Sequence, residues 1–366
     1  MIEQLRSLRI PDDVPIARSA IIPESHRKDF FNEQYDFKTI AYDCISLPKS
    51  KSIVLVCPKL FNLEGLLEAA TFKSGGSVCR IRKIRKYRLY DEVWLSCRRV
   101  ADSIEMEGNG FAIKSKLSSQ EHQGFSGLNV AVTISKDNSL AWIADWAQYH
   151  VVEHGLEAVV LFDNSSEKYE AHDIVQALRH VSGLRKHMVI SAPFPFGPRG
   201  KRPHHSSALF LQSAALNIAR YRFLRTAGAV LNADIDELVY KPGGGSIFAY
   251  TRRTWLGYLS FEGDWYIPDK SCTNPSHRDH VYRLANKRPC PSKWCINPRG
   301  LLRGQAWHVH RVGKRFLSRW AGDASFRYQH CWSINTNWKG HRKINRRHKA
   351  QKDPGAVQRL KRVFRR

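Results

Sequence analysis

The sequence lacks any long apolar run. No stretch approaches the ~20 apolar residues that a membrane-spanning helix needs. The first residues, Met-Ile-Glu-Gln-Leu-Arg, also lack the basic-then-apolar order of a secretory signal. The apolar fraction of 42% is typical of a globular protein, and 366 residues are enough for two domains with sizeable cores. We therefore expect a soluble, cytoplasmic protein.

Paired cysteine motifs are missing as well. The eight cysteines include no C-x-x-C pair, and most lie in apolar, strand-like segments, where a free cysteine behaves as a small hydrophobic residue. The sequence therefore predicts no disulfide framework. A zinc site could be drawn from Cys272, His277, Cys290 and Cys295. Its C-x4-C spacing lies at the edge of the usual range, so this is a minor alternative.

Acidic residues are scarce. The chain has 33 Asp and Glu against 59 Lys and Arg, a formal net charge of +26. An imbalance of this size calls for an anionic partner or ligand, which nucleic acid, an anionic membrane or phosphorylated substrates would supply. The basic residues gather in Arg80–Arg88 and in the tail from 341 to 366, where Asp353 is the single acid.

The end of that tail has an amphipathic pattern. Helical spacing relates Val357, Leu360, Val363 and Phe364, and arginines lie between them. The pattern predicts a short basic helix. Such a helix either lies on an anionic membrane surface or packs its apolar stripe on the protein, and the sequence does not decide between the two.

Apolar and polar residues alternate through residues 1–127. Segments 52–57, 77–82, 91–97 and 110–116 have this pattern and are separated by turn signals such as Gly75-Gly76. Several short strands at regular spacing predict a small β-sandwich-like domain. The polar stretch 118–127 would link it to the rest of the chain.

From residue 128 onward, strand and helix patterns alternate. We expect strands at 129–135, 157–163, 187–192 and 229–233, with helices at 139–153, 168–180 and 206–226. This order predicts an α/β domain with a mostly parallel, Rossmann-like sheet and right-handed crossovers. Neither G-x-G-x-x-G nor G-x-x-x-x-G-K-[ST] occurs at a strand-to-helix junction, which argues against dinucleotide oxidoreductases and P-loop enzymes.

Two carboxylates follow the last of these strands, in Ala229-Val-Leu-Asn-Ala-Asp234-Ile-Asp236-Glu237. Residues i and i+2 of an extended segment share a face, so Asp234 and Asp236 can point into one volume. Open α/β sheets bind ligands at this end of their strands, and Mg²⁺ or Mn²⁺ is typically held by carboxylates and substrate phosphates. The pattern predicts a cation site for a phosphorylated ligand. The alternative is a solvated acidic turn.

Four segments of this second region match a known pattern. They are Trp142–His150, Asp163–Ser166, Gln212–Asn217 and Val230–Leu238. In this order they resemble glycosyltransferase family 92 and related GT-A-fold glycosyltransferases of the family 2 type. The resemblance implies a GT-A domain at 128–345, between the β-rich domain at 1–127 and the basic tail at 346–366. It also implies inverting transfer of a sugar from a nucleotide-sugar, such as a UDP-sugar, to a glycan or glycolipid.

The resemblance extends to residue roles. The nucleotide-sugar would be bound by Ser135, Lys136, Asn138, Asp163, Asn164 and Asp234. Asp234 and Asp236 would hold Mn²⁺ or Mg²⁺ against the diphosphate, whose developing charge the cation stabilises. Family members complete the metal site with a histidine from the C-terminal part, for which His310 and His330 are both candidates.

An inverting enzyme needs a general base that takes the proton from the acceptor hydroxyl. Glu262 and Asp264 are the candidates, because aromatic neighbours such as Trp265 could raise a carboxylate pKa and stack on a sugar ring. An acidic loop beside a core tryptophan is the alternative reading of this segment.

Among the many basic residues, Lys293, Arg299 and Arg303 could contact donor phosphate or an anionic acceptor. Each is otherwise a solvated charge.

Two other protein classes compete with this interpretation. A polyanion- or nucleic-acid-binding protein would explain the charge, but it would not place an acidic pair at a strand end, so no nucleic acid partner is expected. A phosphatase of the haloacid dehalogenase type also uses D-x-D. It usually has Thr or Val two residues after the second Asp, where this chain has Leu238.

The positive net charge and the basic tail together suggest peripheral contact of the protein with the inner face of a membrane.

Overall fold

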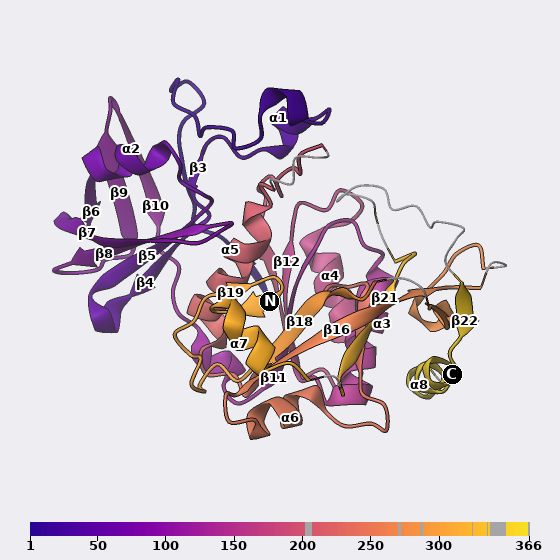
Figure 1. Cartoon of the computed structure of the whole chain (residues 1–366). Coiled ribbons are helices and arrows are strands. Elements are labelled where there is room, and N and C mark those ends of the chain that lie inside the picture. The colour runs from indigo at the N-terminus through magenta and orange to yellow at the C-terminus, as the bar shows by residue number, and fades with distance from the viewer. Residues whose placement is uncertain are drawn as a thin grey trace. The chain divides into compact units, whose positions relative to one another are not determined.

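The computed structural model describes residues 1–201, 207–269, 272–285, 288–323, 325–334, 336 and 349–364 (Figure 1). The chain forms two compact units. The large unit comprises Met1–Glu3, His122–Ser191 and Leu224–Arg366, and the small unit comprises Gln4–Glu121 and Ala192–Phe223. The segment Ala192–Phe223, expected within the second domain, thus belongs to the small unit. The boundaries at 127 and 345 stay a prediction.

The small unit is built on a seven-stranded antiparallel sheet of order β10-β9-β6-β7-β8-β5-β4. Its strands are β4 (Asp43–Leu47), β5 (Ser52–Cys57), β6 (Thr71–Ser74), β7 (Ser77–Lys86), β8 (Asp91–Cys97), β9 (Ser103–Gly108) and β10 (Phe111–Lys116). Strands β2 (Leu8–Arg9) and β3 (Thr39–Ala41) pair separately. The helices are α1 (Phe31–Gln34), α2 (Leu63–Ala69) and α5 (Phe210–Ala219). The alternating segments are strands as predicted, but the described ones join a single large sheet, and a two-sheet sandwich is not established.

Two buried ion pairs hold the segment after α5 in the small unit. Arg220 lies 3.2 Å from Glu92 of β8, and Arg222 lies 3.5 Å from Asp43 of β4. Tyr221 Oη also donates a hydrogen bond to Glu92 at 3.0 Å. Because a buried charge that loses its partner is strongly destabilising, these pairs explain why a segment so late in the chain folds with the amino-terminal sheet.

Cys79 of β7 and Cys97 of β8 form a disulfide, which the sequence did not predict. The antiparallel register of the two strands places these residues directly opposite each other, with Cα atoms 4.4 Å apart. This distance lies in the range that a disulfide requires. Strand pairing, and no local motif, brings the two cysteines together. The remaining cysteines are free.

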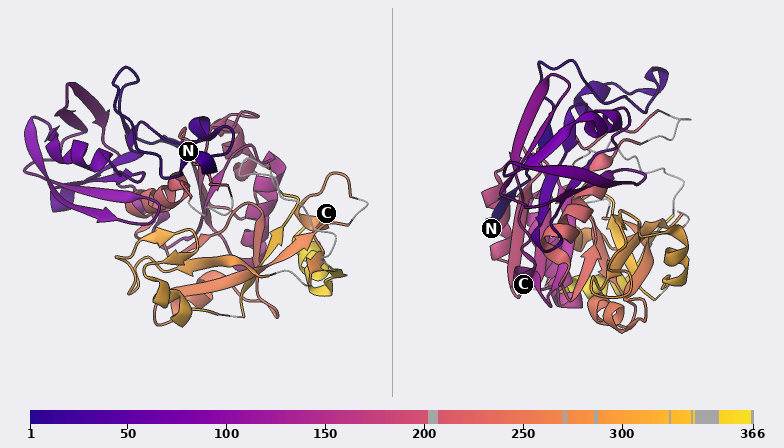
Figure 2. Two further views of the ribbon diagram at one scale, coloured as in Figure 1. Left: turned by 45° about the horizontal axis from the view of Figure 1, so that its top comes forward. Right: turned by 90° about the vertical axis from the view of Figure 1, so that its left-hand side faces the viewer.

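The large unit contains an eleven-stranded mixed sheet of order β1-β13-β12-β11-β14-β18-β16-β17-β22, in which β21 also pairs with β16 and β15 pairs with β21 (Figures 1 and 2). Its strands are β1 (Ile2–Gln4), β11 (Asn129–Ser135), β12 (Ala158–Asp163), β13 (Lys186–Ser191), β14 (Ala229–Asn232), β15 (Glu237–Tyr240), β16 (Tyr258–Ile267), β17 (Tyr282–Leu284), β18 (Cys290–Ile296), β21 (Arg327–Cys331) and β22 (Ala350–Lys352). A separate hairpin joins β19 (Trp307–His308) to β20 (Arg311–Val312). The helices are α3 (Leu140–His154), α4 (Ala171–Arg179), α6 (Ile247–Arg253), α7 (Arg315–Trp320) and α8 (Pro354–Val363).

Four strands of this sheet confirm the predicted parallel pairing. Strands β13, β12, β11 and β14 pair in parallel. The register sets Ser135 of β11 opposite Asp163 of β12, so the carboxyl ends of these strands lie at one edge. β18 and β16 then continue the sheet in antiparallel pairing. The buried core includes the apolar residues of β11, β12 and β14 together with Trp146 and Tyr149 of α3.

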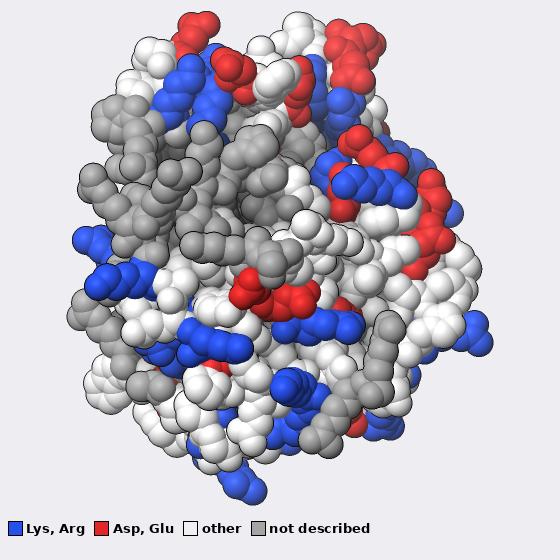
Figure 3. All heavy atoms as spheres, turned by 90° about the vertical axis from the view of Figure 1, so that its right-hand side faces the viewer, with Lys and Arg blue, Asp and Glu red and all other residues white. Residues whose placement is uncertain are grey.

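The packing of helix α8 shows where the apolar stripe of the basic tail lies. Ala356, Leu360 and Val363 are buried in the large unit, and Arg362 donates hydrogen bonds to Glu153 of α3. The apolar stripe therefore packs on the protein, and the predicted membrane contact through this helix finds no support. Acidic and basic side chains are interspersed on the face that carries α8 (Figure 3). Residues 341–348 and 365–366 of the basic tail lie outside the described part of the chain. Among the described residues, no helix is long and apolar enough to cross a membrane.

Candidate functional site

Three carboxylates gather where β14 ends. The chain turns at residues 233–236 and enters β15 at Glu237, so Asp234 and Asp236 belong to a turn and not to an extended strand. Glu237 accepts a hydrogen bond from the Asp234 N–H at 2.8 Å, which closes the turn. The side chain of Glu237 is 4% exposed, whereas Asp234 and Asp236 keep 22% and 16% of theirs exposed. The two aspartates are therefore more accessible to solvent than Glu237.

One group of residues has the chemistry of a metal site. Asp236, Glu237 and His330 each offer a ligand atom, and these atoms lie within 4.8 Å of one another. His330 belongs to β21, whose pairing with β15 sets it opposite Glu237, and its Nδ1 lies 3.5 Å from Asp236 Oδ2. Carboxylate ligands suit Mg²⁺ or Mn²⁺, and the imidazole favours the transition metal. These residues fit a bound Mn²⁺.

The surroundings of His330 fix its orientation. The Trp265 ring stacks on the imidazole with ring centroids 4.2 Å apart. The N–H of Cys331, the next residue, donates to the Asp236 carbonyl at 2.7 Å. His330 is thereby tied to the carboxylate turn through both its ring and its backbone, so the two sides of the group keep their spacing.

Lys293 of β18 neutralises part of the charge in this cluster. Its side chain is 2% exposed, and its Nζ lies 2.9 Å from Glu237 Oε2 and 3.2 Å from Asp234 Oδ1. Burial alone would lower the pKa of the ammonium, but Asp234, Glu237 and Asp236 together raise it above its usual value. Lys293 therefore stays charged. The sequence placed it among many solvated cations, although it lies in the buried stretch 293–296.

The predicted nucleotide-binding residues lie at the ends of β11 and β12. The Asn138 side-chain amide donates to Ser135 Oγ at 2.8 Å, and the Asn164 N–H donates to the Ser135 carbonyl at 2.8 Å. Asp163 is opposite Ser135, and burial raises the pKa of its carboxyl. These four residues form one polar cluster with little exposure. Lys136 lies beside it and donates to the Ser165 carbonyl at 2.8 Å.

This polar cluster and the carboxylate turn occupy the same edge of the sheet. β14 leads into the turn and pairs in parallel with β11, with Asn232 opposite Val132. The carboxyl ends of neighbouring parallel strands form the ligand-binding crevice of open α/β sheets. The predicted nucleotide-binding residues therefore lie along the same edge of the sheet as Asp234 and Asp236.

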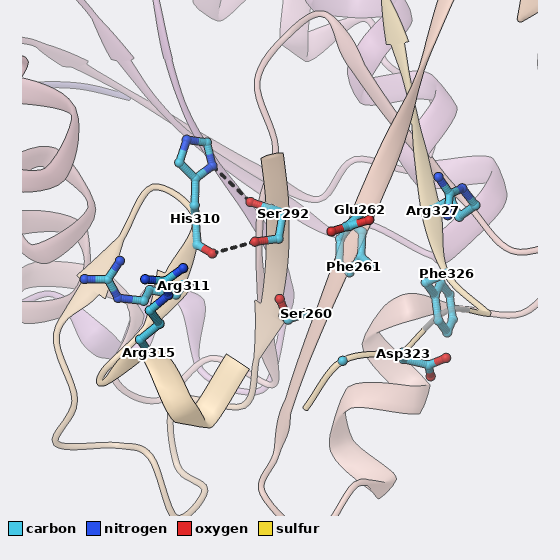
Figure 4. Close-up of a pocket in the computed structure, with 11 residues that line it drawn as sticks. Ser260, Phe261, Glu262, Ser292, His310, Arg311, Arg315, Asp323, Phe326 and Arg327 are labelled. Carbon is cyan, nitrogen blue, oxygen red and sulfur yellow. Dashed lines mark hydrogen bonds between the residues drawn. The ribbon is translucent and has the colours of Figure 1, made fainter. Parts of the chain in front are cut away.

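A cavity of about 560 Å³ lies beside β16 and β18 and collects two other predicted residues (Figure 4). Glu262 and His310 both line it. His310 Nδ1 donates to the Ser292 carbonyl at 3.0 Å, and Ser292 Oγ donates to the His310 carbonyl at 2.9 Å. In the described part of the chain, His310 thus lies outside the Asp236 group.

Asp264, the other predicted base, is held by a cation. Arg327 donates to both of its carboxylate oxygens, at 2.6 and 2.8 Å, and Tyr240 Oη donates at 3.3 Å.

The alternative of a zinc site finds no support. Among the described residues, no group able to hold a metal contains Cys272, Cys290 or Cys295. His277, one of its residues, instead pairs through Nε2 with the Ile235 carbonyl at 2.8 Å.

Buried histidines of α3 brace β15, a role that sequence analysis missed. His150 Nδ1 donates to the Trp146 carbonyl at 2.8 Å, and its Nε2 accepts from the Val239 N–H at 3.3 Å. His154 Nε2 donates to the Val239 carbonyl at 2.8 Å. A carbonyl only accepts and an amide N–H only donates, so His150 must be neutral to make both of its bonds. The Trp142–His150 segment thus anchors the strand that begins with Glu237.

We expect acid to destabilise the protein through these histidines. Burial lowers the pKa of His150 and His280 to about 3 and that of His277 to about 4. Below pH ~6.5, where an unfolded histidine titrates, the unfolded chain binds protons that the folded chain does not, so stability falls as pH falls. Each of these histidines should cost about 2 kcal/mol at pH 5, measured by urea unfolding between pH 8 and 5.

Two histidine variants would test this origin of the pH dependence. His150→Gln should be less stable at pH 8, yet its stability should depend less on pH than that of the unmodified protein. The exposed His172 is the control, because His172→Gln should change neither quantity. A stability that is constant from pH 8 to 5 would contradict the neutral, buried state of the histidines.

Comparisons with known proteins find distant similarity to solved glycosyltransferase structures. No protein-family model matches the sequence, and no curated protein matches it. An active-site mutant of LgtC has a TM-score of 0.27 at 17% identity, over 48% of this chain and 60% of that one. The galactosyltransferase LgtC with donor and acceptor sugar analogs has a TM-score of 0.26 at 16% identity, over 46% and 57%. The bifunctional glycosyltransferase WbbM, in its apo form, has a TM-score of 0.29 at 11% identity, over 52% and 36%.

The match spans less than two thirds of each of these solved chains. Because every TM-score lies below 0.5, these similarities establish neither a shared fold nor a shared activity for this protein.

Proposed function

We propose that this protein is a metal-dependent glycosyltransferase that moves a sugar from a nucleotide-sugar, in the first instance a UDP-sugar, to a glycan or glycolipid, with inversion. The observation that carries the proposal is the grouping of Asp236, Glu237 and His330 at the carboxyl end of β14. The same sheet edge carries the polar cluster around Ser135 and Asp163. A candidate cation site and a polar cluster at one edge of the sheet are what a nucleoside diphosphate needs.

Each part of the site has a role in this proposal. Asp236, Glu237 and His330 would hold the cation, and Trp265 keeps the imidazole oriented. When bound, the cation would neutralise charge that develops on the diphosphate leaving group. Lys293 holds Glu237 and Asp234 in place. The Ser135, Asn138, Asp163 and Asn164 cluster would bind the nucleoside, with Lys136 beside it.

The cavity beside β16 would receive the acceptor, with Glu262 as the general base. Glu262 lines the cavity with an exposed carboxylate, whereas Asp264 is engaged by Arg327. We expect Glu262→Gln to lower kcat for transfer by about 100-fold or more, because general bases contribute that much. The donor KM should be unchanged. Asp264→Asn is the matched variant, and a larger kcat loss in Asp264→Asn than in Glu262→Gln would reverse the assignment.

The proposal is tested by incubating the protein with a panel of sugar nucleotides and measuring release of the nucleoside diphosphate. Slow hydrolysis is expected for one UDP-sugar with Mn²⁺, and a metal chelator should abolish it. If no sugar nucleotide is consumed with any divalent cation, the proposal fails. A polyanion-binding protein would then be the next hypothesis, although it gives no reason for three converging carboxylates. It would be examined by salt-dependent binding to nucleic acid.

A further inference from the structure

Two large apolar side chains project from neighbouring loops of the large unit. Trp255, which follows α6, is 70% exposed, and Leu301, which follows β18, is 69% exposed. Both line a surface depression of about 400 Å³. Its other lining residues are Arg252, Thr254, Gly257, Asn297, Arg299, Gly300 and Arg303. A tryptophan and a leucine are thus held at the surface among arginines.

The two loops are fixed against each other by backbone contacts. The Asn297 N–H of the second loop donates to the Gly257 carbonyl of the first at 2.7 Å, and within the second loop the Gly300 N–H donates to the Asn297 carbonyl at 3.0 Å. Gly257 has a φ of +62°, and a Cβ there would lie 3.2 Å from the Asn297 Cβ. The close approach therefore requires glycine at this position.

Each loop sends one apolar residue inward and one outward. Leu256 and Leu302 are each 6% exposed, whereas Trp255 and Leu301, the residues before them, point to solvent. The inward leucines anchor the loops in the protein. Trp255 and Leu301 are therefore exposed on loops whose neighbouring residues are packed in the protein.

The charge around this pair has one sign. Arg252, Arg253, Arg299 and Arg303 are all exposed. The sequence contains no Asp or Glu from 239 to 261, nor from 280 to 322, so the two loops contribute no compensating acid. An anionic surface would be attracted to this rim.

We propose that Trp255, Leu301 and their arginine rim form a docking surface for an anionic phospholipid membrane. Tryptophan is suited to the headgroup region, an exposed leucine can enter the acyl boundary, and arginines attract anionic headgroups. A single-stranded nucleic acid fits less well, because its bases need aromatic platforms and Leu301 offers none. This surface is separate from the buried stripe of α8, and its role holds whether or not the protein transfers sugars.

Sedimentation with lipid vesicles tests the proposal. We expect the protein to bind vesicles of phosphatidylcholine mixed with phosphatidylglycerol, and not vesicles of phosphatidylcholine alone. Arg299→Ala/Arg303→Ala should weaken binding about 30-fold, from roughly fivefold for each arginine near an anionic surface. Trp255→Ala/Leu301→Ala should weaken it at least about tenfold through lost apolar insertion.

Matched controls come from the small unit. Phe30 is 68% exposed, so Phe30→Ala removes a comparable apolar side chain elsewhere. Arg80→Ala/Arg82→Ala removes two exposed cations of β7. Both control variants should bind vesicles within about twofold of the unmodified protein, which is less than the roughly fivefold loss expected for each arginine that faces the membrane. Thermal unfolding shows that each variant is folded.

Lipids brominated in the acyl chain supply a second readout. They should quench fluorescence in the unmodified protein, and Trp255→Phe should lose most of that quenching while it still binds. The proposal is overturned if Trp255→Ala/Leu301→Ala and Arg299→Ala/Arg303→Ala bind vesicles as tightly as the unmodified protein does. It is also overturned if the protein ignores anionic vesicles but binds single-stranded RNA through the same four residues.

Discussion

Replacement of Lys293 by methionine is expected to lower the free energy of unfolding by about 3–5 kcal/mol, the cost of leaving a buried charge without its partner. Lys293 Nζ lies 2.9 Å from Glu237 and 3.2 Å from Asp234, and its side chain is almost fully buried. Methionine has a similar length but no charge. The variant would leave Glu237 and Asp234 facing each other without a cation. Urea unfolding at pH 8 measures the loss.

A divalent cation should rescue this variant. A ligand that binds only the folded state stabilises it according to its concentration and affinity, and Mn²⁺ at Asp236, Glu237 and His330 would replace the missing charge. Mn²⁺ should therefore raise the stability of Lys293→Met more than that of the unmodified protein. Lys314 is exposed, and Lys314→Met should behave as the unmodified protein does. Equal stability of Lys293→Met and Lys314→Met without metal would contradict the role assigned to Lys293.

The second large effect is expected for Asp236→Asn, which should lower nucleotide-sugar turnover by about 1,000-fold or more. Asp236 is the carboxylate that lies beside His330, and its loss would remove the charge that holds the cation against the developing leaving group. Binding of Mn²⁺, followed by electron paramagnetic resonance, should weaken in parallel. The exposed Asp269 supplies the control, since Asp269→Asn should change neither turnover nor Mn²⁺ binding.

Asp234→Asn makes this prediction specific. Asp234 lies 3.2 Å from Lys293 and outside the Asp236, Glu237 and His330 group. We expect Asp234→Asn to reduce turnover by only about tenfold, the order seen when a partner of a metal ligand is lost. If Asp234→Asn costs as much as Asp236→Asn, both aspartates act on the cation, and the division between metal ligand and lysine partner is wrong.

The predictable part of the site is the part that local pattern determines. Alternation of strands and helices predicted the parallel pairing of β11, β12, β13 and β14, and with it the shared edge that carries Ser135, Asp163 and Asp234. The i, i+2 spacing predicted one joint volume for Asp234 and Asp236. The chain instead turns between them, so Asp236 meets His330 and Asp234 meets Lys293.

The rest depends on pairings between distant strands. His330 joins the carboxylates because β21 pairs with β15, and His310 does not because its hairpin packs beside Ser292. The sequence did not distinguish Lys293 from the many solvated basic residues of the chain. The stripe of α8 has the same spacing whether it packs on a protein or on a membrane, so only its burial decides between them.

The most direct test of the proposed function is calorimetric titration of the protein with UDP, with and without Mn²⁺. We predict binding that requires the cation and is lost in Asp236→Asn while the variant remains folded. This result would place a nucleoside diphosphate at the carboxylate turn. Failure of UDP and of the other nucleoside diphosphates to bind with any divalent cation would contradict a nucleotide-sugar site in this protein.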